Sequence, residues 1–461
     1  MIRSFQTLSP ADGSVVIERP WATGDALEVA LSAAVSAAPG WESTPLTQRQ
    51  VIVEAAVQWL EANEARLAKE LTQQMGRPIR YAAGEIRGTA ARARTMSALA
   101  PDALADITPP AKAGFTRFIR RVPLGVVLVL SPWNYPWLTA VNAIVPALLS
   151  GNVVLLKHSD QTPLVAERFV EAFTAAGLPA GVFQYLHMDH DLTARAVGDP
   201  RVDFVAFTGS LAGGEAVHKA AGGTLKAMGL ELGGKDPAYV RADADLAFAI
   251  ESVVDGAFFN SGQSCCAVER IYVHQDRYAE FVAGATALVQ QYTVGDPMNA
   301  ATTLGPLVRP RNAATVQSQI DAAVSAGARQ LIDTSVFSCP SDAYLPPQLL
   351  VDVDHTMAIM TAETFGPVVG IMAVSGDAEA IRLMNDSAFG LTASIWTQDE
   401  AAAMAIGSAL QTGTVFMNRC DYLDPELAWV GVKGSGRGCT LSAVGFESLT
   451  RPKSFHLRVR Q

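Results

Sequence analysis

The chain is poor in cysteine and in long apolar runs, and each shortage excludes a class of protein. Five cysteines in 461 residues are an odd and thinly spread set, which excludes a disulfide framework and is typical of a reducing compartment. The longest apolar runs, such as residues 124–130, are too short to cross a bilayer. The first seven residues lack the apolar region of a signal peptide. We therefore expect a soluble, cytoplasmic protein without a membrane anchor.

Positive charge and metal-binding patterns are scarce as well. The 35 Lys and Arg residues are outnumbered by 45 Asp and Glu residues, which gives a net charge of −10. A nucleic acid selects for clustered basic side chains, so we expect no nucleic-acid partner. The seven histidines show no metal-ligand spacing and no CxxC pair occurs, so no metal site is expected. The 49% of hydrophobic residues, in a chain longer than one usual core, indicate a globular protein of about two or three domains.

Two kinds of pattern divide the chain. Residues 25–110 are rich in alanine and have apolar residues at helical spacing, such as Val51, Ala55 and Leu60, which predicts helices. Short apolar runs then alternate with helix-like segments such as 163–176. The runs lie at 124–130, 152–156, 182–186 and 202–207. Strands that alternate with helices predict βαβ units and a doubly wound parallel sheet, so the fold class is α/β.

Polar or glycine-containing segments follow three of these strands directly. They are Trp133-Asn134-Tyr135, Lys157-His158-Ser159-Asp160 and Thr208-Gly209-Ser210. Ligands of doubly wound sheets bind beyond the carboxyl ends of the strands, so this placement favours a nucleotide site. A second α/β unit begins near residue 232, with an amphipathic helix at 245–258 and a strand at 270–273.

A thiol and a carboxylate each lie in a glycine-containing turn, on either side of the start of this second unit. Cys265 ends the run Phe259-Asn260-Ser261-Gly262-Gln263-Ser264-Cys265, and Glu231 opens Glu231-Leu232-Gly233-Gly234-Lys235. A thiol can form a covalent acyl intermediate, and a carboxylate can activate the water that hydrolyses it. The structural alternatives are a buried, inert thiol and a capping carboxylate. Asn134 is either a turn residue or a donor to an oxyanion.

A set of motifs in this order resembles the aldehyde dehydrogenase superfamily over nearly the whole chain. The motifs are 132–136, 157–160, 207–210, 231–235, 259–265, 363–367 and 433–437. The resemblance implies a Rossmann-like doubly wound cofactor domain, a second α/β catalytic domain and a small β oligomerisation element. The corresponding ranges are 1–111 with 124–231 for cofactor binding, 232–425 for catalysis, 112–123 with 445–461 for the oligomerisation strands, and 426–444 for a return segment. A homodimer or homotetramer is expected.

By similarity, the reaction is oxidation of an aldehyde to a carboxylic acid with NAD(P). The family's nucleophile lies two residues after the Gln of its GQxC motif, which selects Cys265 over Cys266 to form the thiohemiacetal. The side chain of Asn134 and the N–H of Cys265 would hold the oxyanion. After hydride transfer, Glu231 would activate the water that hydrolyses the thioester.

Two other reactions remain as alternatives. Members of the family that pass the acyl group to coenzyme A usually lack this glutamate, so Glu231 favours hydrolysis. A cysteine-dependent hydrolase or acyltransferase would need a histidine base beside the thiol, and the motifs of Cys265 and Glu231 contain none.

The resemblance also assigns a nicotinamide cofactor to the strand ends. Lys157 and Asp160 would bind the adenosine ribose, Glu363 the nicotinamide ribose, and Phe365 the nicotinamide face. Ser210 would bind a pyrophosphate oxygen, and Trp133 and Gly209 lie at the same strand ends. An acid at 160 repels a 2′-phosphate, so NAD is the predicted cofactor. NADP is the alternative, because Asp is shorter than the family's usual Glu and Ser159 can donate to a phosphate.

The substrate is an aldehyde that the sequence leaves undetermined. Thr139 and Asn142 occupy positions that often carry bulky apolar residues of the family's substrate tunnel, which favours a semialdehyde or hydroxyaldehyde. The loop 418–431, with Tyr422, Leu423 and Trp429, is expected to close the tunnel mouth and favours a larger hydrophobic aldehyde. The two indications conflict, and both stay open.

Overall fold

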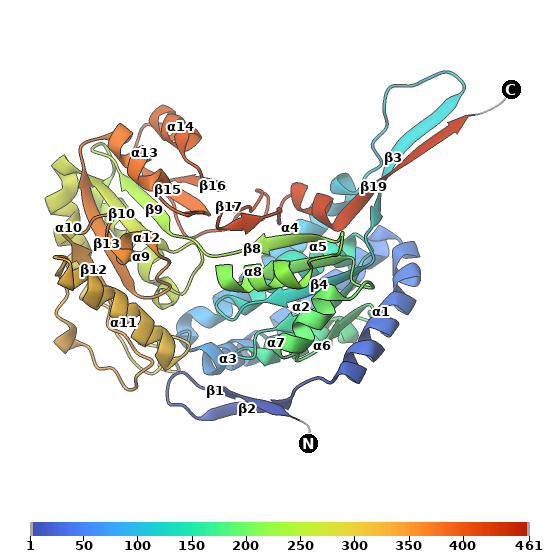
Figure 1. Cartoon of the computed structure of the whole chain (residues 1–461), viewed down its shortest axis with the longest axis horizontal. Helices are drawn as coiled ribbons and strands as arrows, with labels where there is room; N and C mark the ends of the chain where they lie inside the picture. Colours follow the sequence, from blue (N-terminus) through green and yellow to red (C-terminus); the bar gives the residue numbers. More distant parts are fainter. Residues whose placement is uncertain (1–2, 459–461) are drawn as a thin grey trace.

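The computed structural model describes residues 3–458, which form two sheets flanked by helices (Figure 1). The first sheet has the strand order β18-β8-β7-β4-β5-β6, in which only β18 runs antiparallel to its neighbour. Its strands are β4 (Val126–Ser131), β5 (Val153–His158), β6 (Phe183–Tyr185), β7 (Phe204–Thr208), β8 (Ala227–Glu231) and β18 (Gly436–Arg437). All residues of β4 are buried, because helices cover both faces of the sheet, and this explains its continuous apolar run.

The helices of this half precede and alternate with the strands. They are α1 (Gly24–Ser43), α2 (Leu46–Ala62), α3 (Glu64–Met75), α4 (Ile79–Ala103), α5 (Pro136–Leu149), α6 (Pro163–Ala175), α7 (His190–Gly198) and α8 (Leu211–Ala220). The predicted helical region reaches Ala103 and not residue 110. Val51 was wrongly assigned to the apolar face, since it is 68% exposed. The buried face of α2 is formed by Val53, Ala56, Val57 and Leu60.

The second sheet has the order β11-β12-β13-β10-β9-β15-β16. Its strands are β9 (Asp236–Val240), β10 (Val268–His274), β11 (Arg329–Gln330), β12 (Gln348–Val351), β13 (Val368–Val374), β15 (Thr392–Trp396) and β16 (Thr414–Met417). Its helices are α9 (Leu246–Phe258), α10 (Gln275–Val289), α11 (Pro310–Ser325), α12 (Ala358–Thr361), α13 (Asp377–Asn385) and α14 (Glu400–Ala409). The predicted helix at 245–258 is confirmed: Asp245 caps α9 by accepting a hydrogen bond from Phe248 N.

A two-stranded ribbon extends away from the two sheets (Figure 1). It consists of β3 (Phe115–Pro123) and β19 (Thr450–Arg458), which pair antiparallel along their whole lengths. The sequence alternates like an exposed strand at 116–122 and at 454–459, which predicts that the two strands pair with each other or with another subunit. Over the described residues they pair with each other. Residues 459–461 lie outside the described residues. Residues 445–449 were predicted as strand and belong instead to the 3-10 helix η3 (Val444–Leu449).

Short elements that the sequence did not reveal complete the fold. The hairpin of β1 (Ser4–Leu8) and β2 (Val15–Pro20) packs beside α6, and β14 (Phe389–Gly390) pairs with β17 (Val432–Lys433). The 3-10 helices η1 (Phe259–Gly262) and η2 (Thr334–Val336) connect larger elements.

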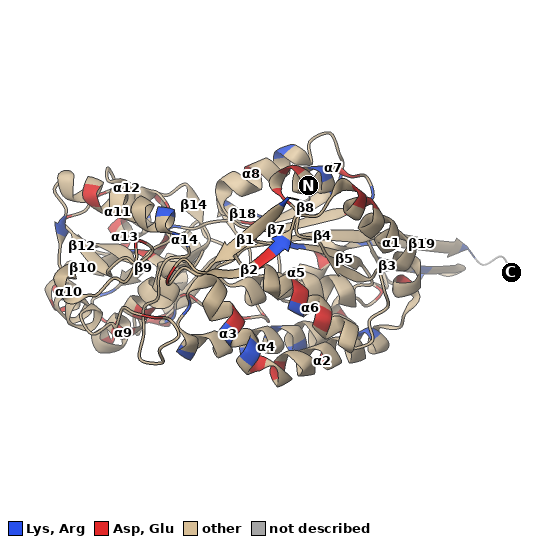
Figure 2. Ribbon diagram, turned by 90° about the horizontal axis from the view of Figure 1, so that it is seen from below, with Lys and Arg blue, Asp and Glu red and all other residues tan. Residues whose placement is uncertain are grey.

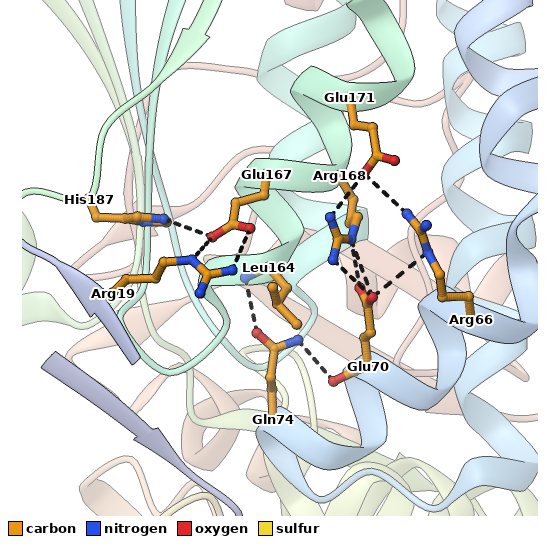
Figure 3. A network of polar contacts seen from close by, with 9 residues as sticks. All are labelled: Arg19, Arg66, Glu70, Gln74, Leu164, Glu167, Arg168, Glu171 and His187. Carbon is orange, nitrogen blue, oxygen red and sulfur yellow. Dashed lines mark hydrogen bonds and ion pairs between the residues drawn. The ribbon is translucent and has the colours of Figure 1, made fainter. Parts of the chain in front are cut away.

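A polar network fastens the N-terminal hairpin and α3 to α6 (Figure 3). Arg19 of β2 donates to Glu167 of α6 at 2.7 Å, and His187 contacts the same carboxylate at 3.1 Å. Arg168, the next residue, donates to Glu70 of α3 at 3.0 Å. Burial raises the pKa of Glu167, but the hydrogen bonds from His187 and Arg19 outweigh it and bring this pKa to about 2. The carboxylate therefore stays charged throughout the neutral range.

Acidic and basic residues are interspersed along α2, α4 and α6 (Figure 2). Arg94 of α4, for example, donates to both Glu54 and Glu61 of α2. Such mixed faces differ from the continuous basic surface that a phosphate backbone requires. Within residues 3–458, no helix combines the length and the apolar character needed to cross a bilayer.

Candidate active site

Cys265 and Glu231 line one cavity of about 1110 Å³. Its walls come from both halves of the molecule: α4 and α5 on the side of the first sheet, and α9 and the segment 418–425 on the side of the second. The predicted tunnel residues Thr139, Asn142, Tyr422, Leu423 and Trp429 all line it. The structure thus brings together the thiol, the carboxylate and the residues that sequence reasoning placed along the substrate path.

The loop that carries Cys265 has an unusual backbone. Asn260, Ser261 and Gly262 have positive φ values of 55°, 56° and 70°, a conformation that costs energy in residues with a side chain. A Cβ added to Gly262 would lie 2.2 Å from the carbonyl oxygen of Gly366. Only glycine therefore allows the Cys265 loop to pack against the loop that follows Glu363.

Side-chain hydrogen bonds hold this loop in place. The Oε1 of Gln263 accepts from Val308 N at 2.8 Å, and Ser264 Oγ donates to Asp421 Oδ1 at 2.7 Å. Cys265 remains partly exposed to the cavity. A rigid loop that presents one accessible thiol is suited to a nucleophile.

Cys266 has a different environment from its neighbour. It is 3% exposed, and its Sγ donates to Asp421 Oδ1 at 3.2 Å. The contact with Cys265, burial and the negative charge of Asp421 together raise the pKa of the Cys266 thiol well above its usual value. Cys266 therefore stays protonated and is a poor nucleophile.

Glu231 ends β8 beside the end of β7. Its carboxylate accepts hydrogen bonds from Thr208 Oγ1 at 3.1 Å and from Thr440 Oγ1. Burial raises the pKa of Glu231, while the two hydroxyls and the positive charge of Arg92 lower it in part. A carboxylate with a raised pKa is a stronger base. A second cavity of about 30 Å³, enough to hold water, lies beside Glu231 and Thr208.

Asn134 directly follows β4 and precedes α5. Its side-chain Nδ2 donates to the backbone oxygen of Gln263 at 3.3 Å, so the amide lies against the Cys265 loop. Its own backbone oxygen accepts from Arg77 at 2.6 Å and from Asn260 Nδ2 at 3.2 Å. Asn134 is 5% exposed, and these contacts fix its orientation toward the loop.

Arg77 and Glu85 are site residues that sequence reasoning missed. They form a buried ion pair, and Glu85 also accepts from Trp137 N and Leu138 N at the start of α5. Burial raises the pKa of Glu85, and the charge of Arg77 opposes this. The pair holds the start of α5, and with it Asn134. In the sequence these residues look like ordinary charges of a surface helix, so no local signal marks them.

The predicted cofactor residues gather at the carboxyl ends of the first sheet. The ends of β5, β4 and β7 are neighbours, which brings Lys157, Asp160 and Ser210 to one edge. Asp160 Oδ1 accepts from Arg309 Nη2 at 2.9 Å, a contact that the sequence did not reveal. Ser159 Oγ lies 3.5 Å from the same carboxylate oxygen. Burial lowers the pKa of Lys157, and Asp160 partly restores it.

Gly209 and Ser210 form the start of α8. Ser210 Oγ accepts from Gly213 N at 3.2 Å and caps the helix. A Cβ on Gly209 would meet the ring of Phe207 at 2.6 Å, so the turn requires glycine. Free N–H groups at such a helix start favour phosphate oxygens.

Glu363 and Phe365 lie in the loop that packs on the Cys265 loop. Glu363 accepts from Gly234 N at 3.1 Å. Burial and the neighbouring charge of Glu269 raise the pKa of Glu363 to about 7. Phe365 has a φ of 55° and faces the ring of Trp133 edge-on, with 5.6 Å between the ring centres. The structure thus places these three predicted cofactor residues near one another.

A buried pair behind this loop was not predicted. Lys235 Nζ donates to Glu269 Oε2 at 2.8 Å and to Thr364 Oγ1 at 2.9 Å. The Glu269 carboxylate accepts from the backbone N–H groups of Thr364 and Phe365. These bonds satisfy both buried charges and hold Phe365 in its strained conformation.

The crevice therefore has the donor set that a nicotinamide dinucleotide requires. A capped helix start suits the pyrophosphate, charged groups at the end of β5 suit the adenosine ribose, and a half-buried carboxylate with two aromatic rings suits the nicotinamide riboside. When bound, such a cofactor accepts a hydride from the substrate carbon.

Comparison with known proteins agrees with this geometry. Residues 2–455 match the model of the aldehyde dehydrogenase family. The succinate-semialdehyde dehydrogenase (NADP(+)) of Mycobacterium leprae (strain TN) is 35% identical over 459 residues, or 98% of this chain and 99% of the relative. The enzyme of the same name from Mycobacterium avium (strain 104) is 35% identical over 97% of this chain and 95% of the relative.

Solved structures agree over the full fold. The NADP-dependent glyceraldehyde-3-phosphate dehydrogenase of Bacillus halodurans C-125, complexed with NADP, superposes with a TM-score of 0.94 at 33% identity, covering 99% of this chain and 96% of that one. An NAD-dependent aldehyde dehydrogenase from Sinorhizobium meliloti gives 0.96 at 31% identity, covering 100% and 92%. The chain belongs to the aldehyde dehydrogenase family. It is an NAD(P)-dependent enzyme that oxidises an aldehyde to a carboxylic acid.

Proposed function

We propose that Cys265 is the nucleophile of this aldehyde oxidation and that Glu231 is the base of its hydrolytic half. The observation that carries the proposal is that the accessible thiol of Cys265 and the carboxylate of Glu231 line one cavity. The buried, hydrogen-bonded Cys266 is unsuited to the first role.

Attack of the Cys265 sulfur on the aldehyde carbon would place negative charge on the carbonyl oxygen. The Nδ2 of Asn134 donates one N–H to the backbone oxygen of Gln263. Its second N–H has no partner among residues 3–458. That N–H and the backbone N–H of Cys265 are the donors we assign to the oxyanion. The Arg77–Glu85 pair prevents Asn134 from moving when the charge develops.

Loss of the hydride leaves a thioester on Cys265. We assign Glu231 to accept a proton from the water that attacks this thioester, which releases the acid and frees the thiol. The raised pKa of Glu231 supports this role. Thr208 and Thr440 orient the carboxylate through its two oxygens.

The alternative reactions have less support. None of the described residues lining the cavity is a histidine, so a cysteine hydrolase or acyltransferase would lack its usual base. The presence of Glu231 at the cavity favours water over coenzyme A as the second nucleophile.

We propose that NAD is preferred and that NADP is also used. Asp160 disfavours a 2′-phosphate by charge repulsion, but its bond to Arg309 neutralises part of that charge. The mycobacterial relatives are named as NADP enzymes, which is consistent with a modest preference only.

An aldehyde panel run separately with NAD and NADP tests both proposals. We expect NAD(P)H formation that depends on the aldehyde, with a higher kcat/KM for NAD. Asp160→Ala should shift the NADP/NAD ratio of kcat/KM toward NADP by about 10-fold, the effect of removing one repulsive charge. Asp189→Ala, which removes a distant surface carboxylate, is the control. An unchanged NADP/NAD ratio of kcat/KM in Asp160→Ala would contradict the assignment of Asp160 to the cofactor site.

Cofactor affinity is expected to depend on pH through Glu363. Its pKa of about 7 means that the carboxylate is charged at pH 8.5 and protonated at pH 5.5. The charged form accepts ribose hydroxyls more strongly, so the Kd for NADH should rise about 3- to 10-fold as the pH falls through 7. Fluorescence titration without aldehyde measures this. The Glu363→Gln variant should bind NADH weakly at every pH. A wild-type Kd for NADH that does not change with pH would contradict the assignment of Glu363 to the cofactor site.

For the substrate, we propose a semialdehyde. The mycobacterial relatives are named for succinate semialdehyde, and Thr139 and Asn142 give the cavity wall polar character.

We also propose that the β3–β19 ribbon joins copies of the chain into a homodimer or homotetramer. An isolated two-stranded ribbon has little stability of its own, and its exposed edges favour pairing.

A further inference from the structure

Arg92 of α4 is a buried cation that no carboxylate within residues 3–458 pairs with. It is 9% exposed and lines the large cavity. One terminal nitrogen donates to Leu138 O at 2.9 Å and to Asn142 Oδ1 at 3.2 Å. The Nε and the other terminal nitrogen have no hydrogen-bond partner among the described residues. These two nitrogens are also absent from the unpartnered atoms that have no exposed surface. Because Arg92 lines the cavity, we infer that their exposed surface faces it.

Such a charge is costly unless a ligand compensates it. Arginine stays protonated under all ordinary conditions, and a buried charge without a partner opposes folding. Two other buried cations near the site are compensated by carboxylates. Arg77 pairs with Glu85, and Lys235 pairs with Glu269. Arg92 stands apart from them.

The nearest carboxylates are already engaged elsewhere. Glu231 accepts from Thr208 and Thr440, and Glu85 accepts from Arg77 and the start of α5. They influence Arg92 only through space. They leave its free N–H groups available.

Asn142 holds the guanidinium of Arg92 from the protein side. It is 2% exposed, its Oδ1 is occupied by Arg92, and its Nδ2 has no partner within the described chain. The hydroxyl of Thr139, by contrast, donates a hydrogen bond to the backbone oxygen of Tyr135. The unused donors that are open to the cavity on this wall thus belong to Arg92.

We propose that Arg92, held in place by the Oδ1 of Asn142, binds a carboxylate at the far end of the aldehyde substrate. A guanidinium presents parallel N–H groups that match the two oxygens of a carboxylate, and the bond to Asn142 Oδ1 fixes its orientation. Arg92 is then the specificity-determining residue for an aldehyde acid. This inference rests on the proposed function and names the part of the chain that selects the semialdehyde.

Acidic residues elsewhere in the cavity define the competing outcome. Glu251 and Asp255 of α9 and Asp421 also line it. Burial raises the pKa of Asp255, as do the charges of Asp421 and Glu251, and Asp421 is bonded to Ser264 and Cys266. If these carboxylates dominated, a cationic aldehyde would be the better substrate.

The test compares aldehydes of equal chain length and different charge on the full-length enzyme at saturating cofactor. Succinic semialdehyde is anionic, butanal is neutral and 4-(trimethylammonio)butanal is cationic. We expect wild type to have the highest kcat/KM for succinic semialdehyde. Arg92→Met should lower that value by about 10- to 100-fold, mainly through KM. Its kcat/KM for butanal should change by less than about threefold, the small effect of losing a group that butanal does not contact.

Arg94→Met is the matched control, because Arg94 lies on the same helix and pairs with Glu54 and Glu61 outside the cavity. It should keep the wild-type discrimination. An equal loss of rate on all three aldehydes in Arg92→Met, with a shifted pH profile, would show that Arg92 acts on Cys265 and Glu231 instead. A wild-type preference for the cationic aldehyde would also overturn the proposal.

Arg92→Lys keeps the test decisive if Arg92→Met fails to fold by circular dichroism. Lysine keeps the charge and loses the paired N–H groups, so discrimination for the anionic aldehyde should fall to an intermediate value. Full wild-type discrimination in this variant, together with unchanged discrimination in Asn142→Leu, would refute the carboxylate site. Failure of wild type to oxidise any aldehyde would count against the proposed function, whereas oxidation without discrimination would count against Arg92 alone.

Discussion

Cys265→Ala should lower NAD(P)H formation by about 10⁴-fold or more, because no other nucleophile can form the thiohemiacetal. Its neighbour Cys266 is buried, bonded to Asp421 and held protonated by its raised pKa. Cys420 also lines the cavity, and burial raises the pKa of its thiol as well. The measurement is steady-state absorbance of the reduced cofactor with a good aldehyde. Cofactor affinity, measured by fluorescence titration, should remain within about twofold of wild type, since alanine removes only the sulfur.

Cys266→Ala is the control for this prediction. It should retain most of the activity, although loss of its contact with Asp421 removes one bond that supports the Ser264–Cys265 loop. Equal losses from the two alanine variants would contradict the assignment of the nucleophile. Alkylation by iodoacetamide followed by peptide mass analysis should label Cys265 first, in line with its exposure to the cavity.

Glu231→Gln should separate the two halves of the reaction. Thiol attack and hydride loss remain possible, but the thioester on Cys265 loses its base, so kcat should fall by about 10²- to 10⁴-fold. The first turnover should then appear as a burst of close to one NAD(P)H per active site. Glutamine keeps the size of the side chain and can still bond with Thr208 and Thr440.

Rapid mixing and intact-mass analysis test this second prediction. The burst should coincide with a covalent acyl adduct on the protein, and the double variant Cys265→Ala with Glu231→Gln should show neither. Wild-type turnover in Glu231→Gln would exclude Glu231 as the base. A burst without any adduct would instead indicate slow release of the reduced cofactor.

These predictions depend on parts of the site that the sequence had already indicated. The apolar runs that became β4, β5 and β7 ended where polar residues began, and parallel strands place such ends along one edge. Cys265, Glu231 and the cofactor residues could therefore be located from local pattern and from the family resemblance. The helical region needed correction at its end and at Val51, because amphipathic spacing alone does not say which face the tertiary fold buries.

The supporting residues could not be found in that way. Arg77 and Glu85 act on Asn134, which lies 57 positions from Arg77, and Glu269 acts on a loop about 95 positions away. In each case a charged residue within a helix or strand pattern resembles a solvated surface charge. Only the burial of such a residue in the folded structure shows that a compensating partner must lie close to it.

The sequence by itself determined the α/β class, the family, the reaction and the residues assigned to its chemistry, because these depend on residue types in fixed local order. The tertiary structure alone decided which charges are compensated and which is left facing the cavity. That distinction depends on contacts between elements far apart in the chain, such as α4 with α5, and on the loss of water that makes an unpaired charge costly. For this reason Arg92, an unremarked helix residue in the sequence, becomes the proposed selector of the substrate.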